Sequence, residues 1–191
     1  MTPGAQAILD AVSGWQQGTS GPLVVAIDGY GGSGKTTITR EVARALQAPI
    51  VETDRFLRQP PQRPPQPPQS HRPQLQKPQP HAPQRRADLA PLAAYYAWHQ
   101  LRTEALIPAT ASGSRLVLVD GVSSAAPALA DLVTRTVFVH TPEAVRLQRL
   151  RARIAPEEWD EHWLAAERRY FASRPPESFD LVVPGVGSCP D

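Results

Sequence analysis

A glycine-rich segment between an apolar run and a helix-like segment constrains this chain more than any other feature. Residues 29–36 read Gly-Tyr-Gly-Gly-Ser-Gly-Lys-Thr, which is a complete phosphate-binding loop. It follows the apolar run 23–27 and precedes the helical pattern of 36–46, the order that the motif requires. Glycines let successive backbone N–H groups turn toward one anion, and the helix adds its positive N-terminal end. The motif therefore predicts a nucleoside triphosphate site; the alternative is a glycine-rich turn that binds nothing.

The motif gives separate roles to its last two residues. We expect Lys35 to reach the β- and γ-phosphates of ATP and Thr36 to offer its hydroxyl to Mg²⁺, so ATP and Mg²⁺ are the predicted cofactors. The residues of this segment predicted to bind ATP are Gly29, Tyr30, Gly31, Gly32, Ser33, Gly34, Lys35, Thr36 and Thr37.

Strand-like and helix-like segments alternate along the chain, which is typical of an α/β fold with a parallel sheet covered by helices. The predicted strands are residues 23–28, 49–52, 115–120, 135–140 and 179–183. The predicted helical stretches are residues 5–16, 36–46, 88–106, 125–132, 142–154 and 156–173. We expect the first helix to lie against the edge of the first strand. Right-handed crossovers would place the functional loops at the carboxyl ends of the strands.

Length and composition favour one domain, residues 1–191, with one unusual segment. Residues 59–86 contain ten prolines and eight glutamines, with Leu75 as their only large aliphatic side chain. Proline removes backbone donors, and this composition buries too little apolar surface to offset the entropy cost of ordering. We therefore predict a disordered or polyproline II segment. The spacing from Arg58 to Pro64 matches an SH3-type ligand, a match that so proline-rich a tract also produces by chance.

The charge distribution and the absence of membrane signals restrict the partners further. The 59–86 segment carries five basic side chains and no acidic one, so the positive net charge of +2 comes from this segment. It does not indicate a basic face that binds nucleic acid, and nucleic acid is not an expected partner. Cys189 is the only cysteine, which excludes an intrachain disulfide or a cysteine-based metal site. No secretory signal pattern and no run of ~18 apolar residues occurs, so a membrane is not an expected partner. We expect a cytoplasmic location.

Phosphoryl transfer needs an acid that orders magnesium, a base for the acceptor and mobile cations. Asp120 ends the third predicted strand, where a carboxylate would hold the water shell of Mg²⁺, or would cap the next turn. Asp54 follows the second strand and would accept the proton of the acceptor hydroxyl, or would cap a helix. With Lys35, these two form the predicted catalytic set. His140 ends the fourth strand and is expected to pack or bond locally.

Four arginines lie on the helical stretch after the fourth strand, at positions 146, 149, 151 and 153. Such a cluster would close over the phosphates as a lid, or would form a solvated helix face. We expect ATP contacts from Arg146, Arg149 and Arg153.

The order of several segments resembles bacterial uridine kinase-like proteins of the phosphoribulokinase and uridine kinase group of P-loop kinases. The resemblance covers residues 20–58 and 115–187 and rests on the phosphate loop, Thr53-Asp54-Arg55-Phe56-Leu57, Val119-Asp120-Gly121, the arginine-rich helix, Glu167-Arg168-Arg169-Tyr170-Phe171, Arg174-Pro175 and Phe179-Asp180-Leu181-Val182-Val183. It implies a P-loop NTPase fold of the nucleoside or nucleotide kinase type, with a five-stranded parallel sheet and helices on both faces. It also implies ATP–Mg²⁺ as donor, a nucleoside or similar small alcohol as acceptor, Asp54 at the catalytic-base position and Asp120 at the acidic strand-end position.

The chain departs from this family on the acceptor side. Leu57 stands where the family usually has a tyrosine that helps shape the nucleoside site. Residues 95–99 resemble the family's Tyr-Asp-aromatic element with Ala97 in place of its carboxylate, although these aromatics equally fit the core of an amphipathic helix. The predicted substrate contacts are Phe56, Tyr96, Trp98 and His99.

Together these patterns predict an ATP-dependent kinase that phosphorylates a small-molecule hydroxyl, with uridine or cytidine favoured by the resemblance alone. A second hypothesis is a nucleotide-binding protein without kinase activity whose altered acceptor region and proline tract serve protein recognition. A third is a kinase for another metabolite.

Overall fold

A five-stranded sheet with all of its strands parallel forms the centre of the computed structural model, which describes residues 1–17, 20–58, 91–154 and 161–186. The strands lie in the order β2-β3-β1-β4-β5. Their bounds are β1 (Leu23–Asp28), β2 (Ile50–Glu52), β3 (Leu116–Asp120), β4 (Arg135–His140) and β5 (Leu181–Pro184). This confirms the predicted α/β fold, and each strand begins within two residues of its expected start.

The first strand lies in the middle of the sheet because both of its edges are paired. β1 pairs with β3 on one side and with β4 on the other, and all six of its residues are buried. A continuous apolar run is typical of a parallel strand that is covered on both faces. The loop that follows β1 therefore leaves the sheet at its centre, where ligands bind in open α/β folds.

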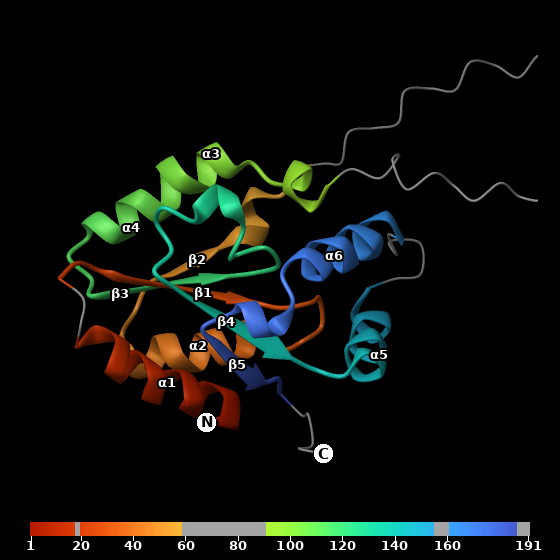
Figure 1. Cartoon of the computed structure of the whole chain (residues 1–191), viewed down its shortest axis with the longest axis horizontal. Helices are drawn as coiled ribbons and strands as arrows, with labels where there is room; N and C mark the ends of the chain where they lie inside the picture. Colours follow the sequence, from red (N-terminus) through yellow and green to blue (C-terminus); the bar gives the residue numbers. More distant parts are fainter. Residues whose placement is uncertain (18–19, 59–90, 155–160, 187–191) are drawn as a thin grey trace, which may run out of the picture.

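Helices cover both faces of the sheet, so the molecule has three layers (Figure 1). One face packs against α1 and α2, and Ile8 and Ile38 meet Val25 in that core. The other face packs against α3, α4 and α6, where Leu101 and Phe171 share a second core. The helix bounds are α1 (Pro3–Gln16), α2 (Lys35–Leu46), α3 (Trp98–Gln100), α4 (Ile107–Ala111), α5 (Glu143–Arg153) and α6 (Glu161–Ser173).

The position of α1 corrects one expectation. Because β1 has no free edge, α1 does not lie against it; the helix packs on the sheet face beside α2 and β5. The helix begins as its sequence indicates, since the side chain of Thr2 accepts a hydrogen bond from the Ala5 N–H at 3.2 Å and Pro3 occupies the first helical position.

The stretch predicted as a helix from 88 to 106 is divided. Residues 92–95 form one 3₁₀ turn, Tyr96 is extended, and the helix then runs from Trp98 through α4, with wide π-type turns at Leu101–Leu106. Pro108 lacks an N–H and would clash with the preceding turn of a regular helix, which accounts for wide turns just before it. Residues 88–90 lie outside the described residues.

Two further helical predictions are revised in extent. The stretch predicted at 125–132 contains only a short 3₁₀ turn at Pro127–Leu129. The stretch predicted at 156–173 is helical from Glu161 onward, and residues 155–160 lie outside the described part of the chain. In contrast, α5 agrees with its predicted range to one residue at each end.

The proline- and glutamine-rich tract at 59–86 lies outside the described residues, as does all of the SH3-like spacing except Arg58. The described segments on either side of it pair with each other. The N–H of Arg58 donates to the carbonyl of Tyr95 at 2.8 Å, the N–H of Ala97 donates to that of Phe56 at 2.8 Å, and Leu57 and Tyr96 form an antiparallel bridge. These bonds hold the acceptor-side segments predicted from the sequence against each other.

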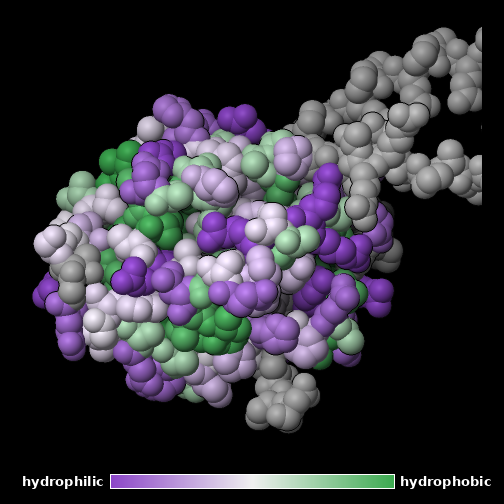
Figure 2. Space-filling model, viewed as in Figure 1, coloured by the Kyte–Doolittle hydropathy of each residue, from purple (hydrophilic) through white to green (hydrophobic). Residues whose placement is uncertain are grey.

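On the face viewed in Figure 2, hydrophobic residues form small patches separated by hydrophilic ones. The large apolar side chains exposed among the described residues come from separate elements: Met1, Leu46, Leu57, Ile107 and Val182. Such scattered exposure is normal for a protein surface. No helix in the described ranges is both long and apolar enough to cross a membrane.

The packing of α1 can be tested by truncating Ile8, which is fully buried against the sheet. We expect Ile8→Ala to lower the free energy of unfolding by about 2–5 kcal/mol, because it removes buried methyl groups and leaves a cavity. Urea unfolding followed by circular dichroism would measure it. The control Ser13→Ala changes an exposed position of the same helix and should shift stability by less than about 0.5 kcal/mol; equal effects of the two would contradict this docking.

Candidate active site

The phosphate loop connects the centre of the sheet to the N-terminus of α2. It runs from Gly29 to Gly34, and α2 begins at Lys35. Gly32 and Gly34 have φ angles of 79° and 93°, a left-handed conformation that a residue with a Cβ adopts only under strain. The glycine spacing read from the sequence is therefore required by the backbone path of the loop.

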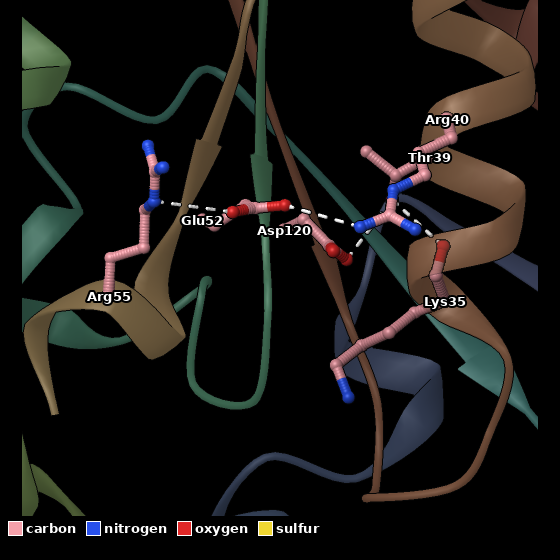
Figure 3. Close-up of polar contacts among 6 residues, drawn as sticks. All are labelled: Lys35, Thr39, Arg40, Glu52, Arg55 and Asp120. Atoms are coloured by element: carbon pink, nitrogen blue, oxygen red, sulfur yellow. Dashed lines mark hydrogen bonds and ion pairs between the residues drawn. The ribbon is translucent and has the colours of Figure 1, made fainter.

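Lys35 supplies the positive charge of this loop. Its side chain is largely buried and extends away from the start of α2 (Figure 3). Its Nζ lies 3.5 Å from the carbonyl oxygen of Tyr30. Burial raises the pKa values of three carboxyl groups, those of Asp28, Asp120 and Glu167, and the positive charge of the lysine acts against each rise. One ammonium group thus stabilises the charged forms of three acids that come from three different elements.

Asp120 is buried at the end of β3, facing α2. Its Oδ1 accepts a hydrogen bond from the hydroxyl of Thr39 at 3.1 Å (Figure 3). The Thr36 hydroxyl also bonds to its carboxyl group. Burial raises the pKa of Asp120, while Lys35 and these hydroxyls act against that rise. The N–H groups of the turn after β3, at Ser123 and Ala125, bond to Asp28, so Asp120 is not their cap.

Asp54 lies beside Asp120 at the carboxyl edge of the sheet. It is exposed in the short turn that follows β2, and the two strands β2 and β3 are paired. At Gly121, an added Cβ would lie 1.9 Å from the Thr53 hydroxyl oxygen and 3.4 Å from Asp54 Oδ1. Only a glycine therefore permits the turn to approach the end of β3 this closely. The charge of Asp54 contributes to the raised pKa of Asp120, as expected for neighbouring carboxylates.

The three arginines predicted as ATP contacts occupy different environments. Arg149 donates to the carbonyl of Gly32 at 3.2 Å and to that of Val186, so it lies on the phosphate loop. Arg146 is buried, with its guanidinium carbon 4.4 Å from the centre of the Tyr30 ring and an ion pair to Glu143. Arg153 is exposed in the last turn of α5. The helix face is thus not uniformly solvated.

The predicted acceptor-side aromatics form a cluster around Tyr96, which packs against Trp98 and Trp163 with ring centroids 4.7 and 6.1 Å away. Its hydroxyl donates to the carbonyl of Val122 at 2.8 Å. Burial raises the pKa of Tyr96, and the charge of Asp54 adds to this, so the ring lies near the predicted base.

The other two predicted acceptor contacts differ in exposure. Phe56 packs against the same core, whereas His99 is exposed at the start of the following helix. His140 is also exposed, at the end of β4, and its ring lies 6.4 Å from that of Phe138, which agrees with the local packing expected for it. Leu57, which stands where the resembled family usually has a tyrosine, is 44% exposed and pairs with Tyr96.

Sequence reasoning missed Asp28, the last residue of β1. Its carboxylate is fully buried and accepts hydrogen bonds from the N–H groups of Gly29, Ser123 and Ala125 and from the Tyr170 hydroxyl, at 2.8–3.1 Å. Burial raises the pKa of Asp28 to about 6, and these bonds limit the rise. An acidic residue at the end of an otherwise apolar strand, directly before the loop, was the signal available in the sequence.

Sequence reasoning also assigned no role to Glu167 of α6, although it quoted the surrounding motif. Its side chain is 1% exposed and accepts hydrogen bonds from the N–H of Gly31 at 2.9 Å and from Nε1 of Trp163 at 3.1 Å. Helical spacing alone would not separate this glutamate from a solvated one. Its role depends on where α6 docks.

The donor set at the loop fits Mg²⁺ bound together with a triphosphate. Mg²⁺ is usually held by one or two protein oxygens, with phosphate oxygens and waters completing the octahedron. Asp120 and Thr36 provide such a pair, because the Thr36 hydroxyl acts on the Asp120 carboxyl group. Within the described ranges, no group of three or more His, Cys, Asp or Glu side chains gathers as a self-contained metal site.

Comparisons with known proteins agree with this geometry. A possible uridine kinase from Bacillus stearothermophilus has a TM-score of 0.55 at 14% identity, covering 93% of this chain and 99% of that one. A candidate fructose transport system kinase from Silicibacter sp. TM1040 has a TM-score of 0.55 at 17% identity, covering 96% of this chain and 100% of that one. At such low identity the likeness shows the fold alone.

Sequence similarity to curated proteins is local. A cytidylate kinase from Pyrobaculum neutrophilum is 54% identical over 37 residues, which are 19% of this chain and 20% of that enzyme. The match therefore spans about a fifth of the curated relative. A family model described as an AAA domain matches residues 24–174, which include the phosphate loop, β1 except its first residue, β2, β3, β4 and all of α6. The chain therefore belongs to this AAA-domain family, and its fold is that of a P-loop NTPase.

Proposed function

We propose that this protein is an ATP-dependent kinase that phosphorylates a hydroxyl group of a small molecule, with a pyrimidine nucleoside such as uridine or cytidine as the favoured acceptor. The similarity to a cytidylate kinase segment and to a possible uridine kinase supports a donor site of the kinase type. The observation that carries the proposal is the placement of Asp54. This exposed carboxylate lies next to Asp120 at the carboxyl edge of the sheet, the edge from which the phosphate loop also leaves, so an acceptor hydroxyl can approach it there.

The proposed reaction gives each residue one task. Lys35 holds the β- and γ-phosphate oxygens, and the loop N–H groups bind the rest of the phosphate chain. Asp54 accepts the proton of the acceptor hydroxyl as its oxygen bonds to the γ-phosphorus, while the bond from that phosphorus to the bridging oxygen breaks and ADP leaves. Thr36 and Asp120 would hold Mg²⁺ when it binds with ATP, and the ion would supply positive charge to the phosphate oxygens. Arg149 lies on the loop beside this path.

The aromatic cluster supports a flat acceptor. Tyr96 is buried and packs against Trp98 and Trp163, which are only partly buried, and partly exposed aromatic rings offer stacking surfaces to a nucleobase. A pyrimidine nucleoside provides both a flat ring and a primary hydroxyl. The departures at Leu57 and Ala97 favour two other candidates, a kinase for another metabolite and a nucleotide-binding protein that acts in protein recognition. A screen of ATP turnover against nucleosides and small alcohols separates the three.

Removal of the loop lysine tests the nucleotide site. We expect Lys35→Ala to weaken Mg²⁺–ATP binding by roughly 10- to 100-fold, because a charge-assisted contact to the phosphates is lost. Titration calorimetry measures this affinity. The control Arg44→Ala removes a positive charge from the exposed far end of the same helix and should leave it unchanged. If both variants bound ATP like the wild type, the loop would not be the nucleotide site.

Replacement of the proposed base tests the chemistry. Asp54→Asn keeps the side-chain shape but cannot accept a proton, so we expect kcat on the acceptor found by the screen to fall by about 10²- to 10⁴-fold. ATP affinity should remain near that of the wild type. The control Asp10→Asn makes the same change on the exposed surface of α1. Near-normal turnover of Asp54→Asn would reduce Asp54 to a structural residue of its turn.

A further inference from the structure

Helix α6 carries a buried carboxylate onto the phosphate loop. The Oε1 atom of Glu167 accepts the N–H of Gly31 at 2.9 Å, and a Cβ at Gly31 would lie only 3.1 Å from the same oxygen. The second oxygen, Oε2, is buried without a hydrogen-bond partner. An acid in this position is unusual, because burial of a carboxylate is costly unless both oxygens are satisfied.

The donors that hold Glu167 are of the kind that hold phosphate. A phosphate loop binds anions through successive backbone N–H groups and one lysine. Glu167 takes the N–H of Gly31, and the charges that face it are Lys35 from α2 and Arg146 from α5. Tyr30 of the loop is the other titratable group beside it, since Glu167 contributes to the raised pKa of that phenol. The carboxylate therefore acts as an internal anion of the loop.

Contacts on both sides of Glu167 hold its helix against the rest of the site. One turn before it, Trp163 packs against the rings of Tyr95 and Tyr96 and donates its Nε1–H to the carboxylate. One turn after it, Phe171 is buried in the core, and the hydroxyl of Tyr170 bonds to Asp28. Anchors on both sides keep the carboxylate beside the loop when a ligand arrives.

We propose that Glu167 is a specificity-determining residue for the phosphate chain, which weakens binding of a nucleoside triphosphate relative to the diphosphate. The inference rests on the proposed nucleotide site. The terminal phosphate brings the most negative group of the ligand to the region that Lys35 and the first half of the loop share with Glu167. The γ-phosphate must compete with the Glu167 carboxylate for Lys35 and is repelled by its negative charge. A diphosphate has no γ-phosphate and avoids both effects. Transfer of the γ-phosphoryl group to the acceptor relieves the conflict.

The proposal predicts a pH dependence of definite sign. Burial raises the pKa of Glu167 above its ordinary value, with Lys35 the largest opposing effect. A nearby terminal phosphate raises it further, so the complex with ATP binds more protons than the free protein. ATP affinity relative to ADP affinity should therefore fall as the pH rises through the raised pKa. Removal of the carboxylate should weaken this dependence, and what remains would come from Asp28 and Asp120, whose pKa values burial also raises beside Lys35.

The test compares Mg²⁺–ATP with Mg²⁺–ADP on the full chain by titration calorimetry at pH 8, without an acceptor. Glu167→Gln keeps an oxygen for Gly31 but loses the charge, so ATP should bind about tenfold tighter while ADP changes by less than about twofold. The control Glu161→Gln makes the same change at an exposed position of α6 and should alter neither affinity.

Equal effects of Glu167→Gln on both nucleotides, no effect, or weaker ATP binding would each refute the role of Glu167 while leaving the proposed function in place. Absence of binding of either nucleotide to the wild type would refute both. If Glu167→Gln does not fold, the wild type decides alone. A ratio of ATP to ADP affinity that does not fall between pH 5 and 8 would overturn the proposal.

Discussion

One buried carboxylate holds the site together. Asp28 ends the central strand and accepts four hydrogen bonds, from the first residue of the phosphate loop, from two N–H groups of the turn after β3, and from Tyr170 of α6. Loss of an acceptor would leave buried donors unpaired at a cost of about 1–3 kcal/mol each. The segments that surround the donor site therefore share one hydrogen-bonded carboxylate, so a change in one segment alters the hydrogen bonds of the others.

The sheet order determines where this anchor can act. With β1 between β3 and β4, the loop leaves at the middle of the carboxyl edge, and β2 and β3 bring Asp54 and Asp120 to one side of it. The glycine at 121 allows the turn after β2 to approach the end of β3. Donor and acceptor residues thus meet at a single edge, although they come from separate parts of the chain.

Helix α6 joins the two halves of this edge. Within two turns it contacts the acceptor-side aromatics through Trp163, the phosphate loop through Glu167 and the central strand through Tyr170. The hydrogen bond between Trp163 and Glu167 makes the connection direct. Lys35 is the common counter-charge, because its ammonium limits the rise that burial causes in the pKa values of acids from β1, β3 and α6. Binding of a triphosphate and Mg²⁺ would change how the charge of Lys35 is shared among these acids.

The sequence by itself determined the features that depend on neighbours along the chain. The phosphate loop at 29–36, the five strands and the strand-end positions of Asp54 and Asp120 follow from local spacing and apolar runs. The parallel sheet follows from the alternation of strands and helices. These features were predictable because the residues that produce them are adjacent.

Only the tertiary structure decided the placement of α1 on a sheet face, the burial of Arg146 and the roles of Asp28 and Glu167. The decisive partners of the last two lie 142 and 136 positions away in the chain. No local pattern distinguishes a glutamate whose helix docks on a phosphate loop from one that faces water. Its environment, and hence its pKa and its function, exists only once the distant segments have packed together.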